Sequence, residues 1–197
     1  MKIEDVKLPE DILFWAKSKG HVVFDSRPWD LNIIGVRKKN GVPNRFDDRI
    51  FVVCKDDAEV LRMWSWAVTT DPGLFWMQNP MNKLGTACLV PGQYRGCWQI
   101  GLHSGKPALK QIKTVKTYRD SNKDTILDLD PSTISEGLYG INIHRAGKDS
   151  QSVDKWSAGC QVFPRDDDFD DFMELCNKQV SSARYTTFSY TLLEEED

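Results

Sequence analysis

The sequence lacks the features that mark several common classes of protein. Its five cysteines form no C-x-x-C pair, so neither a zinc site nor a full disulfide framework is indicated. No run approaches the roughly 18 uninterrupted apolar residues of a membrane span. With 26 basic and 29 acidic residues, the chain has a formal net charge of -3 and no basic cluster for nucleic acid. We therefore expect no membrane span, no nucleic-acid partner, no metal and no cofactor.

The first ten residues also lack the apolar core of a signal peptide. We therefore expect a protein that is synthesised in the cytoplasm. The odd number of cysteines agrees with thiols that stay reduced there.

The composition that is present is globular. Hydrophobic residues make up 40% and aromatic residues 11% of the 197 residues, which is enough for one domain with a core. No internal repeat or low-complexity linker interrupts the chain. We divide it into an N-terminal helix and strand extension packed on the core, residues 1–30, and a main domain, residues 31–197.

Short segments rich in β-branched and aromatic residues predict strands, because clusters of proline, glycine, asparagine and aspartate separate them. The predicted strands are Val22–Phe24, Leu31–Arg37, Ile50–Cys54, Val60–Thr69, Ala87–Val90, Cys97–His103, Lys113–Tyr118, Gly140–His144 and Tyr185–Leu193. The pattern favours a mostly β, antiparallel single domain with one helix near each end.

Two segments have the pattern of helices. Pro9–Gly20 has proline and acids at its start and lysines and glycine at its end. The acidic run that begins at Asp166 resembles a calcium-binding loop, but it lacks the glycine and the terminal glutamate of an EF-hand. Its apolar residues instead follow helical spacing, at Phe169, Phe172, Met173, Cys176 and Val180.

Alternation along Val60–Val68 places Trp64 and Trp66 on one surface of a sheet. A packed core face is the favoured interpretation, and a platform for a glycan is the alternative.

The chemistry of the chain is concentrated around one histidine and one cysteine. The apolar run that ends in His144 alternates as a strand does, and Ser157, Ala158 and Gly159 directly precede Cys160. A thiol needs a base to become a nucleophile, and small residues before it let backbone N–H groups face the carbonyl that the sulfur attacks. Ser157 either orients this turn or contacts substrate. The pattern predicts a site for cysteine acyl transfer.

The order of His144, a loop and Ser157-x-Gly159-Cys160 resembles the catalytic signature of the L,D-transpeptidase (YkuD-like) family, cysteine enzymes that remodel peptidoglycan. Residues 67–73 and 85–94 fit the same family more loosely, and the likeness runs from about Leu31 to Val162. The resemblance implies a β-sandwich or partly open barrel with a helix after the cysteine segment. It also implies that a backbone carbonyl holds the second nitrogen of His144.

Three positions depart from the family pattern. The family commonly has glycine after the histidine, histidine or lysine between serine and glycine, and arginine two positions after the cysteine. Arg145, Ala158 and Val162 stand there instead. Because the family's arginine is thought to meet a substrate carboxylate, we expect Arg145 or Arg165 to supply that charge.

Other residues flank the predicted cleft in sequence and are candidates for substrate binding. His103 lies at a strand end before a turn and is a rival base, and Trp156 is a candidate wall of the pocket. Tyr94, Tyr139 and Asn142 complete the set, with ordinary packing as the alternative for each.

Taken together, the sequence predicts an enzyme that forms a Cys160 thioester with peptidoglycan stem peptides and then transfers or hydrolyses it. Because the first residues carry no signal peptide, we expect such a protein to reach the cell wall by way of a phage or a secretion apparatus, or from a precursor with a further N-terminal segment. The alternative is an inactive structural or wall-binding protein of a virion or secretion apparatus that keeps the fold. A third interpretation is an unrelated cysteine hydrolase, which would share the cysteine chemistry and act on a different substrate.

Overall fold

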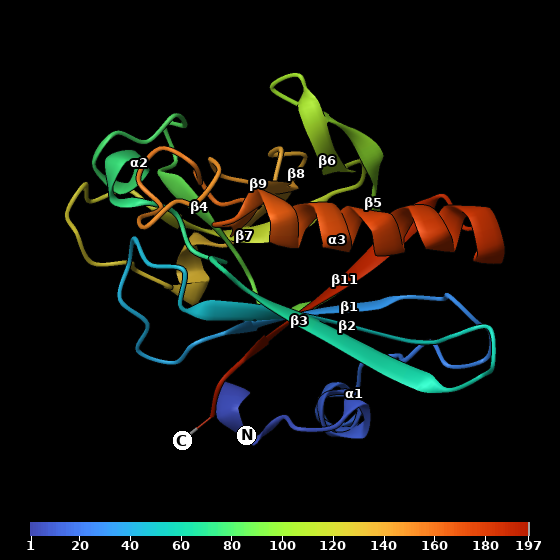
Figure 1. Cartoon of the computed structure of the whole chain (residues 1–197). Coiled ribbons are helices and arrows are strands. Elements are labelled where there is room, and N and C mark those ends of the chain that lie inside the picture. The colour runs from blue at the N-terminus through green and yellow to red at the C-terminus, as the bar shows by residue number, and fades with distance from the viewer. Residues whose placement is uncertain (197) are drawn as a thin grey trace.

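Strands make up most of the regular structure, which confirms the predicted mostly β fold. The computed structural model describes residues 1–196. Its strands are β1 (Asn32–Arg37), β2 (Asp48–Lys55), β3 (Leu61–Val68), β4 (Thr86–Leu89), β5 (Gly92–His103), β6 (Lys106–Gln111), β7 (Val115–Asp120), β8 (Ser135–Gly137), β9 (Ile143–Arg145), β10 (Gln161–Phe163) and β11 (Thr187–Glu194) (Figure 1). Its helices are α1 (Pro9–Ser18), α2 (Leu74–Gln78) and α3 (Asp166–Lys178), with shorter helical turns at Ile3–Asp5, Pro131–Thr133 and Gln179–Ala183.

The large sheet has the strand order β10-β9-β6-β5-β11-β1-β2-β3 and curls back on itself. Its two ends meet where Thr69, directly after β3, exchanges backbone hydrogen bonds of 2.9 and 3.0 Å with Val162 on β10. Most neighbouring strands are antiparallel, but β1–β11 and β9–β10 are parallel pairs. The sheet is therefore a nearly closed barrel with the β9–β10 pair at its seam.

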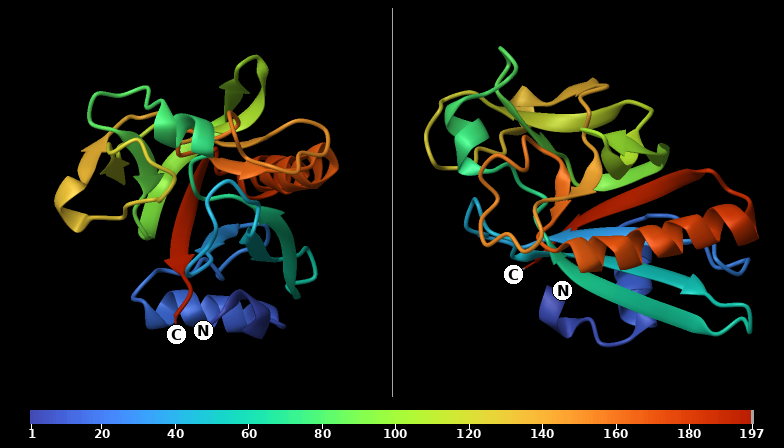
Figure 2. Two further views of the ribbon diagram at one scale, coloured as in Figure 1. Left: turned by 90° about the vertical axis from the view of Figure 1, so that its left-hand side faces the viewer. Right: turned by 45° about the horizontal axis from the view of Figure 1, so that its top comes forward.

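Helices cover the large sheet on both faces (Figures 1 and 2). Ile12, Leu13 and Trp15 of α1 pack against Ile34 and Phe51 on one face of β1 and β2. The helix α3 packs against the opposite face. Every residue of β1 is consequently buried, because the sheet has no solvent-facing side there.

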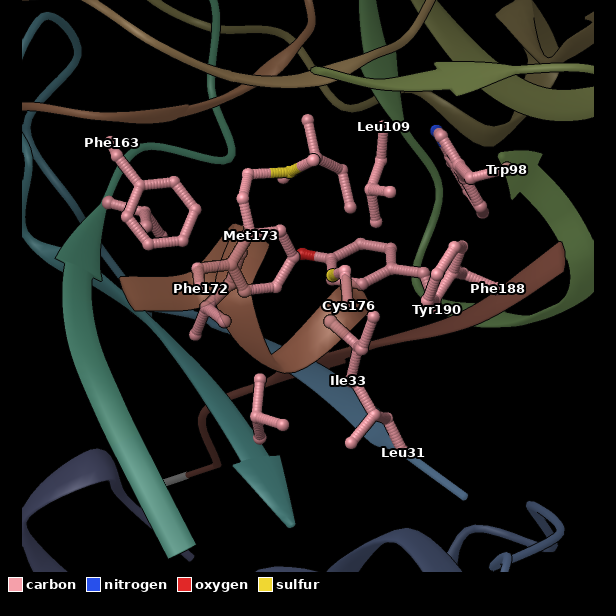
Figure 3. Packing of buried hydrophobic residues seen from close by; sticks show 14 of the residues in the cluster. Leu31, Ile33, Trp98, Leu109, Phe163, Phe172, Met173, Cys176, Phe188 and Tyr190 are labelled. Atoms are coloured by element: carbon pink, nitrogen blue, oxygen red, sulfur yellow. The ribbon is translucent and has the colours of Figure 1, made fainter. Parts of the chain in front are cut away.

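The main core lies between α3 and the concave side of the large sheet. In Figure 3, Phe172, Met173 and Cys176 of α3 lie in one cluster with Ile33 and Tyr190 of the strands. The helical spacing read from the sequence is thus confirmed, and the acidic run forms the first turn of α3, where carboxylates favour the helix dipole.

The two tryptophans of β3 belong to this core. Trp66 is buried against Phe163 and Phe172, with ring centroids 6.0 and 6.2 Å away. Trp64 is half-buried and packs against the same cluster. The core interpretation is confirmed for Trp66, whereas Trp64 lies at the edge of the core and also lines a surface pocket with Trp29.

One close approach in the core anchors the segment that follows Cys160. A Cβ atom on Gly35 of β1 would lie 1.8 Å from the Tyr190 hydroxyl, so only glycine leaves room for that ring. The hydroxyl donates to the side-chain oxygen of Gln161 at 2.9 Å. The first residue of β10 is thereby tied to β11 across the core.

The small sheet has the order β4-β7-β8 and stands beside the turn that precedes Cys160. Gly159 in that turn has a φ of +118°, and a Cβ there would lie 2.5 Å from the carbonyl oxygen of Ala87 on β4. The absence of a side chain at this position therefore allows the turn to rest directly on β4.

The prediction is wrong or incomplete in several segments. Residues 22–24 form no strand, because the side chain of Gln93 takes the place of a neighbouring strand and bonds both the N–H and the carbonyl of Val22. The helix α2 and the strands β6 and β8 were not predicted, and β9 is shorter than the predicted Gly140–His144. The N-terminal extension packs on the core through α1 and not through a strand.

Candidate active site

The imidazole of His144 is buried on β9 and is held by one backbone carbonyl. Its Nδ1 lies 2.8 Å from the carbonyl oxygen of Arg145. Because a carbonyl only accepts, Nδ1 carries the proton and the neutral ring has its lone pair at Nε2. Nε2 is buried and has no hydrogen-bond partner within residues 1–196.

The surroundings of His144 keep its ring uncharged. Burial lowers the pKa of His144 to about 4, the bond to Arg145 opposes this effect, and the neighbouring His103 adds to it. At neutral pH the ring is therefore in the form that can accept a proton.

The thiol of Cys160 is held between two backbone groups of the segment before β9. Sγ donates to the carbonyl of Gly140 at 3.4 Å and accepts from the N–H of Asn142 at 3.4 Å. Burial raises the pKa of Cys160 to about 11, and the N–H of Asn142 offsets this only in part. At rest the site therefore holds a neutral thiol and a neutral imidazole, not an ion pair.

The register of β9 and β10 places the two groups on the same face of the sheet. In the parallel ladder, Val162 is paired with His144 and Gln161 with Ile143. The N–H of Gln161 also donates to the carbonyl of Asn142, which extends the same register by one residue. Cys160 therefore lies beside Asn142, on the side of the sheet to which His144 points. Diagonal neighbours of this kind are about 7–8 Å apart between Cα atoms, within reach of an imidazole. In the present conformation no hydrogen bond joins the two, because Sγ faces Gly140.

The turn before Cys160 is closed by the hydroxyl of Ser157. Its Oγ donates to the Cys160 carbonyl at 2.9 Å and accepts from the N–H of Gly159 at 3.2 Å. Ser157 thus has the turn-orienting role that the sequence allowed for, and it is fully buried. The N–H of Gly159 is occupied, whereas those of Ala158 and Cys160 donate to no acceptor within residues 1–196.

His103, at the end of β5, stacks on His144. The ring centroids are 4.3 Å apart and the planes differ by 16°. The side-chain nitrogen of Asn142 lies 3.0 Å from Nδ1 of His103. The side-chain oxygen of Asn142 accepts a hydrogen bond from the N–H of Gln111 at 2.9 Å. Asn142 is thus a buried connector between β6, His103 and the thiol, a role that the sequence did not indicate.

A pocket of about 220 Å³ opens over the two histidines. Its lining residues are His103, Ser104, Lys106, Pro107, His144, Arg145, Ala146, Lys155 and Trp156. The predicted residues His103, His144, Arg145 and Trp156 are therefore brought together. Cys160 is only 8% exposed and lies behind the wall of the pocket, where it packs with Ala146 and Val162.

The cations of the pocket differ from those expected. Arg145 lines it but is paired with Asp166 on α3 at 3.1 Å. Arg165 lies outside the pocket, beside Asp167 and Asp168. The lysines Lys106 and Lys155 were not predicted, because a lysine at a hairpin end or in a loop has no distinguishing sequence pattern.

Tyr94 and Tyr139, like Asn142, are predicted substrate-binding residues that do not line the pocket. The Tyr94 hydroxyl donates to the Val90 carbonyl at 2.7 Å, and its ring packs on the core. Tyr139 stacks under the guanidinium of Arg119, 4.0 Å from its ring centroid. For both, the alternative of ordinary packing describes the structure.

Within residues 1–196, no helix has the length and apolarity of a membrane span, and no cluster of three or more metal-ligating side chains is found. No family model, curated protein or solved structure matches the chain.

Proposed function

We propose that the protein is a cysteine acyl-transfer enzyme acting on peptidoglycan stem peptides, with Cys160 as nucleophile and His144 as base. The observation that carries the proposal is the state of His144: its Nδ1–H is fixed by the Arg145 carbonyl and its Nε2 is buried, unprotonated and unpaired. A buried polar atom without a partner is costly to a folded protein and requires an explanation, of which a catalytic role is one. Cys160, on the same face of the adjacent strand, is the acid that Nε2 would deprotonate.

The reaction begins with transfer of the thiol proton from Sγ to Nε2 of His144 as the sulfur attacks an amide carbonyl. The imidazolium then gives this proton to the departing amine, the C–N bond breaks and a thioester remains on Sγ. A water or an acceptor amine next loses a proton to Nε2 and attacks the thioester, which restores the thiol. Water gives hydrolysis and an amine gives transpeptidation, so both share the first half-reaction.

The backbone before Cys160 supplies donors for the negative charge that develops on the carbonyl oxygen. The N–H groups of Ala158 and Cys160 are unoccupied donors of this turn. Donors that are already in place stabilise the transition state more than the ground state. Gly159 contributes by allowing the turn to rest on β4, and not through its own N–H.

The charge of the pocket suits a substrate that carries a carboxylate. Lys106 and Lys155 line it, and Val162 stands where the family has arginine. Because Arg145 is already paired with Asp166, Lys106 on β6 is the cation we assign to the substrate carboxylate. Delivery to the cell wall by a phage or a secretion apparatus belongs to the same proposal.

Purified muropeptides incubated with wild type and with Cys160→Ala, followed by mass analysis of the products, test the reaction. We expect cleaved or exchanged stem peptides with the wild type only. An acyl adduct on Cys160 should be seen by intact mass when a carbapenem is used, and it should disappear in His144→Ala. Identical products from wild type and Cys160→Ala would refute the proposal.

A second candidate is an inactive wall-binding protein of a virion or secretion apparatus. The observation in its favour is that Sγ is bonded to Gly140, lies behind the pocket wall and has a raised pKa of about 11. Iodoacetamide separates the two candidates. Selective labelling of Cys160 that depends on His144 supports the enzyme, and uniformly slow labelling of all five cysteines supports the inert protein.

A further inference from the structure

The stacked pair of imidazoles at the candidate site contains two histidines whose tautomers are set by different neighbours. Each assignment follows from a group that can only donate or only accept. Together they give His103 a defined role that the proposed reaction has not used.

The orientation of the Asn142 amide follows from the backbone of β6. The N–H of Gln111 lies 2.9 Å from Oδ1 of Asn142, and only the oxygen of an amide can accept this bond. The amide nitrogen therefore faces Nδ1 of His103 at 3.0 Å and donates to it. The neutral His103 ring must then carry its proton at Nε2.

His144 has the opposite tautomer. Its Nδ1 donates to the Arg145 carbonyl, so its lone pair is at Nε2. The ring of His103 covers it at a centroid distance of 4.3 Å with nearly parallel planes. A ring that is buried on one side and stacked on the other has little freedom to rotate about χ2.

We propose that His103 is a positioning residue that Asn142 locks in its neutral Nε2–H form, so that it holds the His144 ring in plane without opposing the positive charge His144 acquires. This inference rests on the proposed function, because it concerns the same base. His103 needs no contact with the reacting atoms for this role.

Protonation of His103 is opposed by its contacts. A proton on Nδ1 would meet the Asn142 amide donor, and turning that amide would break its bond with Gln111. A positive charge on His103 would also lie 4.3 Å from the imidazolium that His144 becomes, and the two like charges would repel each other. The other charged groups around the pair are mostly cationic. They are Lys106 on β6, Lys155 in the loop before β10, and Arg145 on β9 with its partner Asp166 on α3.

The substitution Asn142→Asp tests this arrangement with almost no change in shape. A carboxylate still accepts from the N–H of Gln111 but cannot donate to His103. We expect Nδ1 of His103 to gain a proton, either by a change of tautomer or by formation of the imidazolium. The tautomer of His144 should stay the same, since its own partner is the Arg145 carbonyl.

Side-chain 15N NMR of histidine-labelled protein reads both rings directly. In the wild type at pH 7, the unprotonated nitrogen should be Nδ1 in His103 and Nε2 in His144. In Asn142→Asp we expect Nδ1 of His103 to be protonated and the rate of Cys160 alkylation at pH 6–7 to fall at least about tenfold. The pH profile of that rate should gain a limb with the pKa of His103.

Two further variants apply if Asn142→Asp does not fold. His103→Gln can keep an acceptor for the Asn142 amide, and His103→Phe keeps a stacked ring without an acceptor. We expect His103→Gln, which removes the stacked ring, to lower kcat more than it raises KM. His103→Phe, which keeps a neutral stacked ring, should lower kcat less.

The same tautomer in both wild-type rings, or an unchanged His103 spectrum in Asn142→Asp, would overturn the inference. These spectra need no turnover, so they are independent of whether Cys160 forms a thioester. An acyl adduct together with the wrong tautomers rejects only the positioning role. Absence of any adduct, with the expected tautomers, rejects the proposed function and leaves the geometry of the pair intact.

Discussion

The turn that carries Cys160 depends on a glycine that touches a neighbouring strand, so Gly159→Ala is the sharpest perturbation of the site's framework. The φ of +118° at Gly159 is one that side-chain-bearing residues rarely adopt. The added Cβ would also lie 2.5 Å from the carbonyl oxygen and 3.1 Å from the carbonyl carbon of Ala87. Both contacts are with the backbone of β4, which cannot move aside as a flexible side chain does.

The expected cost has two parts. The disfavoured φ contributes about 1–2 kcal/mol. Forcing the turn away from β4 contributes about 1–3 kcal/mol more, as for an overpacked core. For a chain of this length, a total of about 3 kcal/mol lowers the Tm by about 6–12 °C.

A matched control separates the two parts. Gly20, after α1, has a φ of +79°, and a Cβ there meets no atom within 4 Å. Gly20→Ala should therefore lose only the conformational part, about 1 kcal/mol or about 2–4 °C. Thermal unfolding followed by circular dichroism measures both variants, and iodoacetamide labelling reports whether Cys160 has moved. If Gly159→Ala melts within 1–2 °C of Gly20→Ala, by the same conversion, the turn is not pressed against β4 and our account of it is wrong.

Three further outcomes follow from the site and the core. The pKa of His144 is about 4 in the folded protein and 6.5 in the reference state, so its neutral form adds to the free energy of unfolding above pH 6.5, and this contribution is lost as the pH falls toward 4. Urea unfolding at pH 7 and pH 4 measures the loss. The decrease in the free energy of unfolding should be about 3 kcal/mol smaller in His144→Phe than in the wild type. Because the pKa of Cys160 is about 11, its iodoacetamide labelling in the absence of substrate should rise continuously from pH 7 to pH 10, and a plateau above pH 6 would instead indicate a resting thiolate. Lys106→Ala should raise KM for a carboxylate-bearing stem peptide about tenfold with little change in kcat, whereas Lys110→Ala on the same strand but outside the pocket should leave KM unaltered.

The sequence alone was sufficient for the class of fold, and it indicated the pair of residues from which the candidate site is built. A continuous apolar run marks β2, which is buried on both faces, period-two alternation marks β3, and helical spacing marks α3. Each pattern reflects how the element meets the core. A cysteine preceded by small residues, together with a histidine on a strand, indicates nucleophilic cysteine chemistry before the fold is known.

Segments whose partners lie far away in the chain were harder to predict. Residues 22–24 have strand-like composition, yet Gln93 satisfies their backbone and no neighbouring strand is present. The strand β6 contains Pro107 and two lysines, and it is a strand because β5 and β9 flank it. Such segments are decided by tertiary pairing more than by intrinsic preference.

What the sequence determined was the presence of a thiol, an imidazole and the small residues directly before the thiol. Only the tertiary structure decided their surroundings. The parallel register of β9 and β10 put Cys160 and His144 on one face, and the curl of the sheet brought His103 from β5 onto His144. The same burial made both partners neutral, raising the pKa of the thiol and lowering that of the imidazole. Distances between strands and desolvation arise only when the chain is folded, so no local pattern of residues encodes them.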